Sequence, residues 1–122
     1  MNMELIALLS SGKGTWGQVA GLVNREKWDR VILITDVFFK SSVGEFNFSK
    51  NAELVIVDFN AGIKESIAEL KEKLKNKIQG IEVALTIASG SGKEHMALIS
   101  ALLQLPVGIK FVALTKDGIK EI

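Results

Sequence analysis

The sequence contains one arrangement twice: an apolar run, a Ser-Gly-Lys loop and a segment of helical periodicity. The apolar runs 5–9 and 82–87 lead into the loops 11–13 and 91–93. Aligned on their lysines, the two segments also match at the apolar positions that follow, which pair Trp16 with Met96, Val19 with Ile99 and Val23 with Leu103. Short apolar runs without alternation are typical of strands buried on both faces. The repeated strand–loop–helix unit therefore predicts an α/β fold.

The apolar pattern of the remaining chain predicts the other elements. Besides the two repeated strands, we expect strands at 31–35, 53–59, 110–114 and 118–122. Helices are expected at 16–28, 63–78 and 94–105. Asn60 is a suitable N-cap for the second of these helices, and Asp117-Gly118 is a strong hairpin signal. Residues 37–52 contain four phenylalanines and predict a loop or short helix that packs aromatic rings onto the edge of the core.

This order of elements predicts a Rossmann-like, doubly wound, mostly parallel sheet with helices on both faces and a C-terminal β-hairpin. No linker or shift in composition divides the chain, so residues 1–122 are expected to form one domain. In the doubly wound strand order 3-2-1-4-5, the strands at 5–9 and 82–87 are neighbours, and ligands bind beyond their carboxyl ends. Both Ser-Gly-Lys loops should therefore line one crevice.

Composition excludes several classes of function. Fifteen basic and 14 acidic residues give a net charge of +1, without a basic stripe, which argues against binding to duplex nucleic acid or a membrane surface. The chain has no cysteine, which excludes disulfides, thiolate metal sites and cysteine nucleophiles. The acidic residues are dispersed, so no metal site and no cofactor are predicted. No apolar run approaches the roughly 20 residues of a membrane span, and we expect a cytoplasmic protein.

The two loops have the composition of an anion site. Glycines allow backbone N–H groups to approach a ligand, a helix N-terminus adds partial positive charge, and lysine adds a full charge. The candidate ligand-binding residues are Ser10, Ser11, Gly12, Lys13, Gly14, Ser89, Gly90, Ser91, Gly92, Lys93 and Met96. Neither loop is a Walker A motif, because Ala7 and Ile87 occupy the position of its first glycine. The alternative is that both loops are only the turns that any α/β fold requires.

Two further features bear on the chemistry. Gly12-x-Gly14-x-x-Gly17 followed by Asp36 matches the dinucleotide fingerprint, in which the acid holds a ribose hydroxyl. His95, the single histidine, lies in the first turn of the last helix and is a candidate general acid or base. A histidine without a visible carboxylate partner is also a common polar cap residue.

The helix expected at 94–105 is apolar on nearly all sides. Such a helix is normally buried on two sides. Its own sheet supplies one side, and a second copy of the chain supplies the other in the interpretation that we favour. We therefore expect a homodimer through helix 94–105. Burial by neighbouring helices is the alternative.

From Glu82 to Ile122 the sequence predicts a strand, a Gly-rich loop with Lys93, an apolar helix with Met96, a strand reading Ile-Lys-Phe-Val and a closing Asp-Gly hairpin. In the order of these features the chain resembles the CRISPR-associated Rossmann fold (CARF) domains of antiviral defence. The first loop, with Ser10 and Ser11, extends the likeness. The family loop runs Gly-Gly-Thr-Lys-x-Met, whereas this chain has one more residue between lysine and methionine.

The resemblance implies a homodimer that binds a cyclic oligoadenylate in a cleft over its twofold axis. Some family members, the ring nucleases, cleave this ligand without a metal. By the resemblance, Ser11 and Lys93 would then be the catalytic residues. Two other functions remain open: a small NAD-type dinucleotide-binding protein that uses the glycines and Asp36, and a structural or assembly subunit without a ligand.

Overall fold

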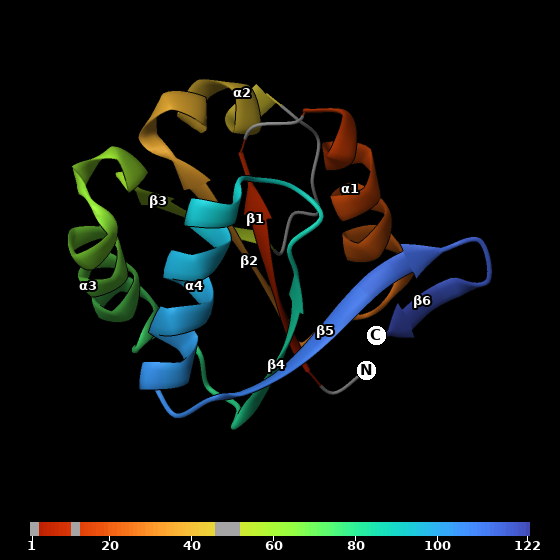
Figure 1. Cartoon of the computed structure of the whole chain (residues 1–122). Helices are drawn as coiled ribbons and strands as arrows, with labels where there is room; N and C mark the ends of the chain where they lie inside the picture. The colour runs from red at the N-terminus through yellow and green to blue at the C-terminus, as the bar shows by residue number, and fades with distance from the viewer. Residues whose placement is uncertain (1–2, 11–12, 46–51) are drawn as a thin grey trace.

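A computed structural model describes residues 3–10, 13–45 and 52–122 (Figure 1). The strands are β1 (Glu4–Leu9), β2 (Arg30–Asp36), β3 (Ala52–Val57), β4 (Glu82–Thr86), β5 (Gly108–Thr115) and β6 (Gly118–Glu121). The α-helices are α1 (Trp16–Arg25), α2 (Lys40–Glu45), α3 (Ile63–Leu74) and α4 (Gly92–Gln104). Three short 3₁₀ helices are η1 (Lys13–Thr15), η2 (Val37–Phe39) and η3 (Phe59–Ala61).

The six strands form one sheet in the order β3-β2-β1-β4-β5-β6. All pairings are parallel except that of β5 with β6, which is the antiparallel C-terminal hairpin. The predicted Rossmann-like fold, its strand order and its hairpin are confirmed. Because β1 lies between β2 and β4, the ends of the two repeated strands are adjacent, with Ala7 paired to both Leu33 and Thr86.

Helices cover both faces of the sheet, which explains the unbroken apolar run of β1. On one face, α3 and α4 pack on side chains such as Ile6 and Leu85. On the other, α1 and α2 pack on Leu5, Ala7 and Leu9. Every residue of β1 is therefore buried. None of the helices in the described ranges has the length and apolarity needed to cross a bilayer.

The helix boundaries differ from the predicted ones where side chains cap the backbone. Asn60 is not the N-cap of α3; it lies within η3, and its N–H donates to Asp58, while Gly62 occupies the cap position. The helix expected from residue 94 begins at Gly92, because Ser91 caps it. Helix α1 ends at Arg25 and α3 at Leu74, earlier than the apolar periodicity alone predicted.

The aromatic segment 37–52 forms η2 and α2 in its first part. Phe39 packs against the core, as predicted, but Phe38 is 80% exposed. Phe46 and Phe48 lie outside the described residues.

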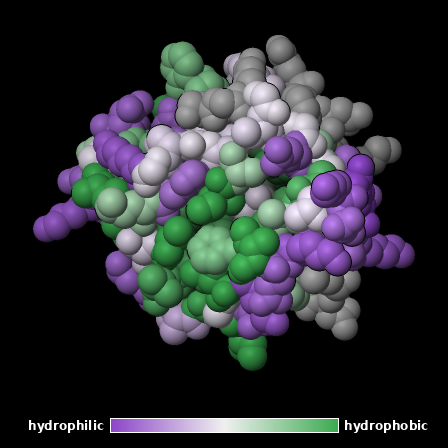
Figure 2. Space-filling model, turned by 45° about the vertical axis from the view of Figure 1, so that its right-hand side comes forward, coloured by the Kyte–Doolittle hydropathy of each residue, from purple (hydrophilic) through white to green (hydrophobic). Residues whose placement is uncertain are grey.

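Helix α4 is buried against the sheet and against α3, yet it keeps an apolar exposed stripe. Leu98, Ala101 and Leu102 are buried, whereas Met96 and Leu103 are 61% and 65% exposed. Figure 2 shows an apolar area on one face of the molecule. Besides the exposed pair, the partly buried apolar residues of this region are Ile99, Ile109 and Phe111. We call these five residues the α4–β5 patch.

Candidate functional site

A buried polar seam joins the end of β1 to the start of α4. Ser10, 2% exposed, donates its hydroxyl hydrogen to Glu94 Oε2 at 2.5 Å. The N–H of Ser10 donates to Ser89 Oγ at 3.1 Å. These hydrogen bonds join the residue after β1 to the segment between β4 and the first turn of α4, at the carboxyl ends of neighbouring strands. Ser10 was predicted to bind a ligand, but its hydroxyl hydrogen is donated to Glu94.

The start of α4 is a capping box. Ser91 Oγ accepts from the N–H of Glu94, and Glu94 Oε1 accepts from the N–H of Ser91 at 2.8 Å. In an α-helix the first N–H groups have no intrahelical acceptor, so those of Gly92 and Lys93 are the ones that this box leaves for a ligand. The Lys93 side chain is exposed beside them.

His95 and Gly90 shape the loop that precedes α4. His95 Nε2 lies 2.8 Å from the carbonyl oxygen of Ser89. A carbonyl oxygen only accepts, so Nε2 is the donor. This contact turns the imidazole back onto its own loop, which favours the structural over the catalytic interpretation of His95. Gly90 has φ +102°, and a Cβ there would lie 2.5 Å from Leu8 Cδ2.

The first loop is described in part. Ser11 and Gly12 lie outside the described residues, and the Lys13 backbone begins η1. Trp16, 1% exposed, donates its indole N–H to the Ser10 carbonyl oxygen at 3.0 Å. This bond fixes the end of β1 relative to α1.

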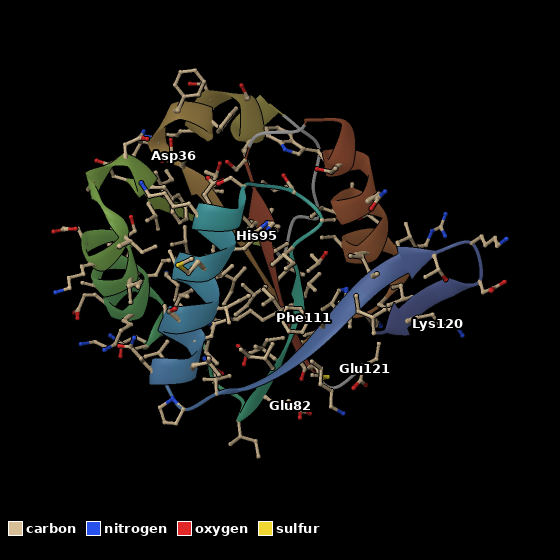
Figure 3. The ribbon with its side chains drawn as sticks, viewed as in Figure 1. Asp36, Glu82, His95, Phe111, Lys120 and Glu121 are labelled. Carbon is tan, nitrogen blue, oxygen red and sulfur yellow. The ribbon has the colours of Figure 1, made fainter. Side chains whose placement is uncertain are left out.

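A pocket of about 290 Å³ opens at this edge of the sheet. It is lined by Ser10, Asp36, Phe38, Phe39, Phe59, Asn60, Ser91, Lys93 and Glu94. We call it the edge pocket; Figure 3 labels Asp36 on one side of it. Of the predicted ligand-binding residues, it brings together Ser10, Ser91 and Lys93. Ser89, Gly90 and Met96 are not part of its lining.

Five of the lining residues were not predicted from the sequence as ligand contacts: Phe38, Phe39, Phe59, Asn60 and Glu94. Phe38 and Phe59 each lie two residues beyond the end of a strand, β2 and β3 respectively, so the rule that ligands bind beyond strand ends could have indicated them. Glu94 could have been identified from the capping-box spacing Ser91-x-x-Glu94.

Asp36 ties the ends of β2 and β3 together. Its Oδ1 accepts from the N–H of Phe59 at 2.9 Å, and its Oδ2 accepts from the N–H of Phe38 at 3.0 Å. Both oxygens of the acid proposed for a ribose thus hold the protein's own turns. Gly17 of the fingerprint has nothing within 4 Å of an added Cβ, so close helix–strand packing does not require glycine there. Because the packing does not require the third glycine of the fingerprint, Gly17 disfavours the dinucleotide interpretation.

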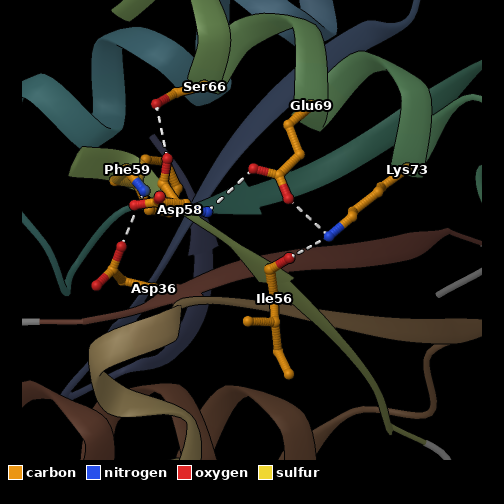
Figure 4. A network of polar contacts seen from close by, with 7 residues as sticks. All are labelled: Asp36, Ile56, Asp58, Phe59, Ser66, Glu69 and Lys73. Carbon is orange, nitrogen blue, oxygen red and sulfur yellow. Dashed lines mark hydrogen bonds and ion pairs between the residues drawn. The ribbon is translucent and has the colours of Figure 1, made fainter. Parts of the chain in front are cut away.

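A second polar network connects Asp58, which follows β3, to helix α3 (Figure 4). Glu69 Oε1 accepts from the N–H of Asp58 at 3.0 Å, and Glu69 Oε2 pairs with Lys73 Nζ at 2.7 Å. Burial raises the pKa of Glu69, but the hydrogen bonds from Lys73 and Asp58 and the charge of Lys73 outweigh it, so that the pKa lies below its ordinary value. The network fixes η3, which carries Phe59 and Asn60 to the edge pocket.

The opposite end of the sheet has a hollow of about 250 Å³ between Glu4, Arg30 and Glu82. Both Gln79 and Gly80 donate their N–H groups to the Glu4 carboxylate there. These bonds fasten the turn before β4, and the hollow lies at the amino ends of the strands, where doubly wound folds do not bind ligands. Within the described ranges, no three histidine, aspartate or glutamate side chains form a metal-ligand set.

No family model and no curated protein sequence matches the chain. Solved structures with a similar fold include a wide-type short-chain dehydrogenase/reductase from Veillonella parvula in complex with NADP, with 13% identity and a TM-score of 0.54. The match covers 91% of this chain and 47% of the dehydrogenase, so the chain spans about half the length of that protein. The fold is Rossmann-like. A second similar structure is the C-terminal domain of a hydrogenase from Pyrococcus furiosus, with 15% identity, a TM-score of 0.46 and 89% of each chain covered.

Proposed function

We propose that the chain is a nucleotide-binding domain that binds cyclic oligoadenylate at a homodimer cleft. The observation that carries this proposal is the meeting of the two loops: the end of β1 and the first turn of α4 are hydrogen-bonded together beside the edge pocket. In a doubly wound sheet this is the place where nucleotides bind.

The local charge supports binding of a phosphate at the mouth of the pocket. Lys93 provides a full positive charge, and the N–H groups of Gly92 and Lys93 lie at the positive end of the α4 dipole. At about 290 Å³ the pocket is at the small end of the range for drug-sized ligands. A ligand as large as a cyclic oligonucleotide would need a wider surface, which two copies side by side would supply.

The α4–β5 patch supports a homodimer. Met96 and Leu103 are seven residues apart on one face of α4 and are both largely exposed. Exposed apolar patches of this kind are typical of interfaces between proteins. An interface through α4 would also place two copies of the second loop near one twofold axis.

The proposal includes metal-independent ring opening, by resemblance to the ring nucleases. A ribose 2′-oxygen attacks the adjacent phosphorus, the bond from phosphorus to the 5′-oxygen breaks, and the 2′ proton ends on the released 5′-hydroxyl. Lys93 would stabilise the charge that develops on the phosphate oxygens. Ser11 is assigned the assisting role from the resemblance alone.

Isothermal titration calorimetry with cyclic tetra-adenylate and cyclic hexa-adenylate tests the proposal. We expect binding of one of them by the wild type, and at least tenfold weaker binding by Lys93→Ala. Lys116→Ala, which removes a lysine from the turn between β5 and β6, is the matched control and should bind as the wild type does. Chromatography of the incubated ligand detects ring opening. Absence of both heat and cleavage would contradict the proposal.

The same measurements separate the two other functions. A dinucleotide-binding protein would bind NAD and lose that binding in Asp36→Ala. An assembly subunit without a ligand would bind neither nucleotide. The double variant Lys13→Ala/Lys93→Ala would then differ from the wild type only by a slight change in melting temperature.

A further inference from the structure

The floor of the edge pocket is acidic. Asp36 and Glu94 are only 5% and 7% exposed, and both line the pocket. A carboxylate is a pure acceptor with about four lone-pair sites. Within the described residues, each of the four oxygens accepts one hydrogen bond, from Phe59, Phe38, Ser91 and Ser10. The remaining sites can accept from a neutral donor, whereas a phosphate placed there would be repelled by both carboxylates.

The rim of the pocket is aromatic. Phe38 is 80% exposed, yet its position is defined by an edge-to-face contact with Phe39, with ring centroids 5.0 Å apart and an interplanar angle of 81°. Phe39 in turn meets the buried Trp16 edge-to-face at 6.4 Å. This chain of three rings runs from the core to the rim. It holds the ring of Phe38 in place while leaving most of its surface open to a planar ligand.

The cationic group of the pocket lies at its mouth. Among the lining residues, Lys93 carries the positive charge, and its side chain is exposed at the start of α4. A nucleotide has the complementary division: a negative phosphate at one end, and at the other a flat base with a neutral amine donor in adenine. The charges therefore orient a nucleotide with its base inside and its phosphate outside.

We propose that the edge pocket is a base subsite that binds an aminopurine base. The base stacks on Phe38, and its exocyclic amine donates hydrogen bonds to the Asp36 and Glu94 carboxylates. The phosphate stays outside, at Lys93 and the first turn of α4. This subsite deepens the proposed function and rests on it: it assigns the recognition of adenine to residues that follow β2 and begin α4.

Equilibrium binding of adenosine and inosine 5′-monophosphates to the full chain tests the subsite. The two bases differ at position 6, an amine donor in adenine and a carbonyl acceptor in hypoxanthine, and at the adjacent N1, an acceptor in adenine and an N–H donor in hypoxanthine. We expect the adenosine compound to bind at least about tenfold more tightly, because the carbonyl oxygen would face carboxylates. A 2′-deoxyadenosine monophosphate should bind like the adenosine compound, which separates contact through the amine from contact through the ribose.

Variants of the rim provide the second test. Phe38→Ala should bind adenosine monophosphate about ten- to hundredfold more weakly, the effect of losing one aromatic stacking partner, and Phe38→Trp should restore binding. Because Phe38 is mostly exposed, the melting temperatures of these variants should equal that of the wild type. Val37→Ala, which alters the exposed neighbour outside the pocket lining, is the matched control and should bind as the wild type does.

The outcomes distinguish the subsite from the proposed function. Equal binding of the adenosine and inosine compounds, or unchanged binding by Phe38→Ala, would overturn the subsite even where cyclic tetra-adenylate still binds through Lys93. Binding of adenosine monophosphate that depends on Phe38, without binding of any cyclic oligoadenylate, would support the subsite and overturn the cyclic ligand. Absence of binding by all of these ligands at millimolar concentration would overturn both.

Discussion

The hydroxyl of Ser10 donates to the Glu94 carboxylate at 2.5 Å, across 84 positions of the sequence. The same carboxylate accepts from the N–H of Ser91 and so completes the capping box of α4. One buried side chain therefore connects the end of the first repeated strand to the helix that follows the second. The end of β1, which leads into the first Ser-Gly-Lys loop, and the second loop at the start of α4 are thus parts of one hydrogen-bonded unit.

Removal of either partner should destabilise the fold. Ser10→Ala takes a donor from a carboxylate that is 7% exposed, and hydrogen bonds to charged groups contribute roughly 1.5–3 kcal/mol. We expect a loss of this size in the free energy of unfolding, measured by urea denaturation. Ser100→Ala, on the partly buried face of the same helix, is the control and should change stability little. In a Glu94→Ala background the Ser10→Ala change should cost much less; equal costs in both backgrounds would contradict direct coupling.

Gly90 should not tolerate a side chain. Its φ of +102° is unfavourable for other residues, and an added Cβ would lie 2.5 Å from Leu8 Cδ2 and 3.2 Å from His95 Nε2. Gly90→Ala should therefore lower the free energy of unfolding by about 1–3 kcal/mol. Gly14→Ala, where nothing lies within 4 Å of the added atom, should be nearly neutral. Thermal unfolding of both variants measures the difference, and similar melting temperatures would show that the loop does not require glycine at residue 90.

Much of the fold could be predicted from the sequence, because it depends on local patterns. The run Leu5–Leu9 has no polar position, as a central strand covered on both faces requires. A glycine-rich loop follows each of two such runs, so both loops could be predicted to lie at the carboxyl edge of the sheet. The errors at helix ends have a different origin. Asn60 is of a residue type that often caps helices. In the structure, however, the Asp58 side chain accepts a hydrogen bond from the Asn60 N–H and caps a 3₁₀ helix there.

The candidate site was less predictable, because its contacts join distant positions. The bond from Phe59 to Asp36 spans 23 residues and depends on the pairing of β2 with β3. The acidic floor of the edge pocket likewise arises only when the ends of β1, β2 and α4 meet. A loop of serine, glycine and lysine indicated an anion site, whereas the assembled lining also contains two buried carboxylates and exposed Phe38.

The hydrogen bonds of Glu69 with Asp58 and Lys73 should contribute to stability in a way that depends on pH. The pKa of Glu69 is lowered from its ordinary value of 4.5, so the ionised form stabilises the folded state above that pH. The contribution disappears as the pH falls through the folded-state pKa. The Lys73 and Glu69 side chains are 42% and 32% exposed, so the ion pair should contribute less than about 1 kcal/mol.

The difference in melting temperature between wild type and Glu69→Gln measures this contribution. We expect the wild type to be more stable at pH 7 and the difference to shrink as the pH falls below 4.5 and through the lowered folded-state pKa of Glu69. Glu72→Gln, which removes the more exposed partner of Lys75, is the control and should lose less at pH 7. A difference that stays constant as the pH is lowered to the acid unfolding limit would show that Glu69 acts through packing rather than charge.

The α4–β5 patch predicts which substitution separates two copies of the chain. Leu103 is 65% exposed on α4, so Leu103→Glu should leave the fold intact while placing a charge in an apolar interface. Sedimentation velocity should show a dimer for the wild type and a monomer for Leu103→Glu, with similar melting temperatures at low protein concentration. Leu54→Glu makes the same change at a residue that is 37% exposed on β3, at the far edge of the sheet from β6, and it should stay dimeric. If the wild type is a monomer, or if Leu103→Glu and Leu54→Glu behave alike, helix α4 is not the dimer interface, and a cyclic ligand would have to bind within a single chain.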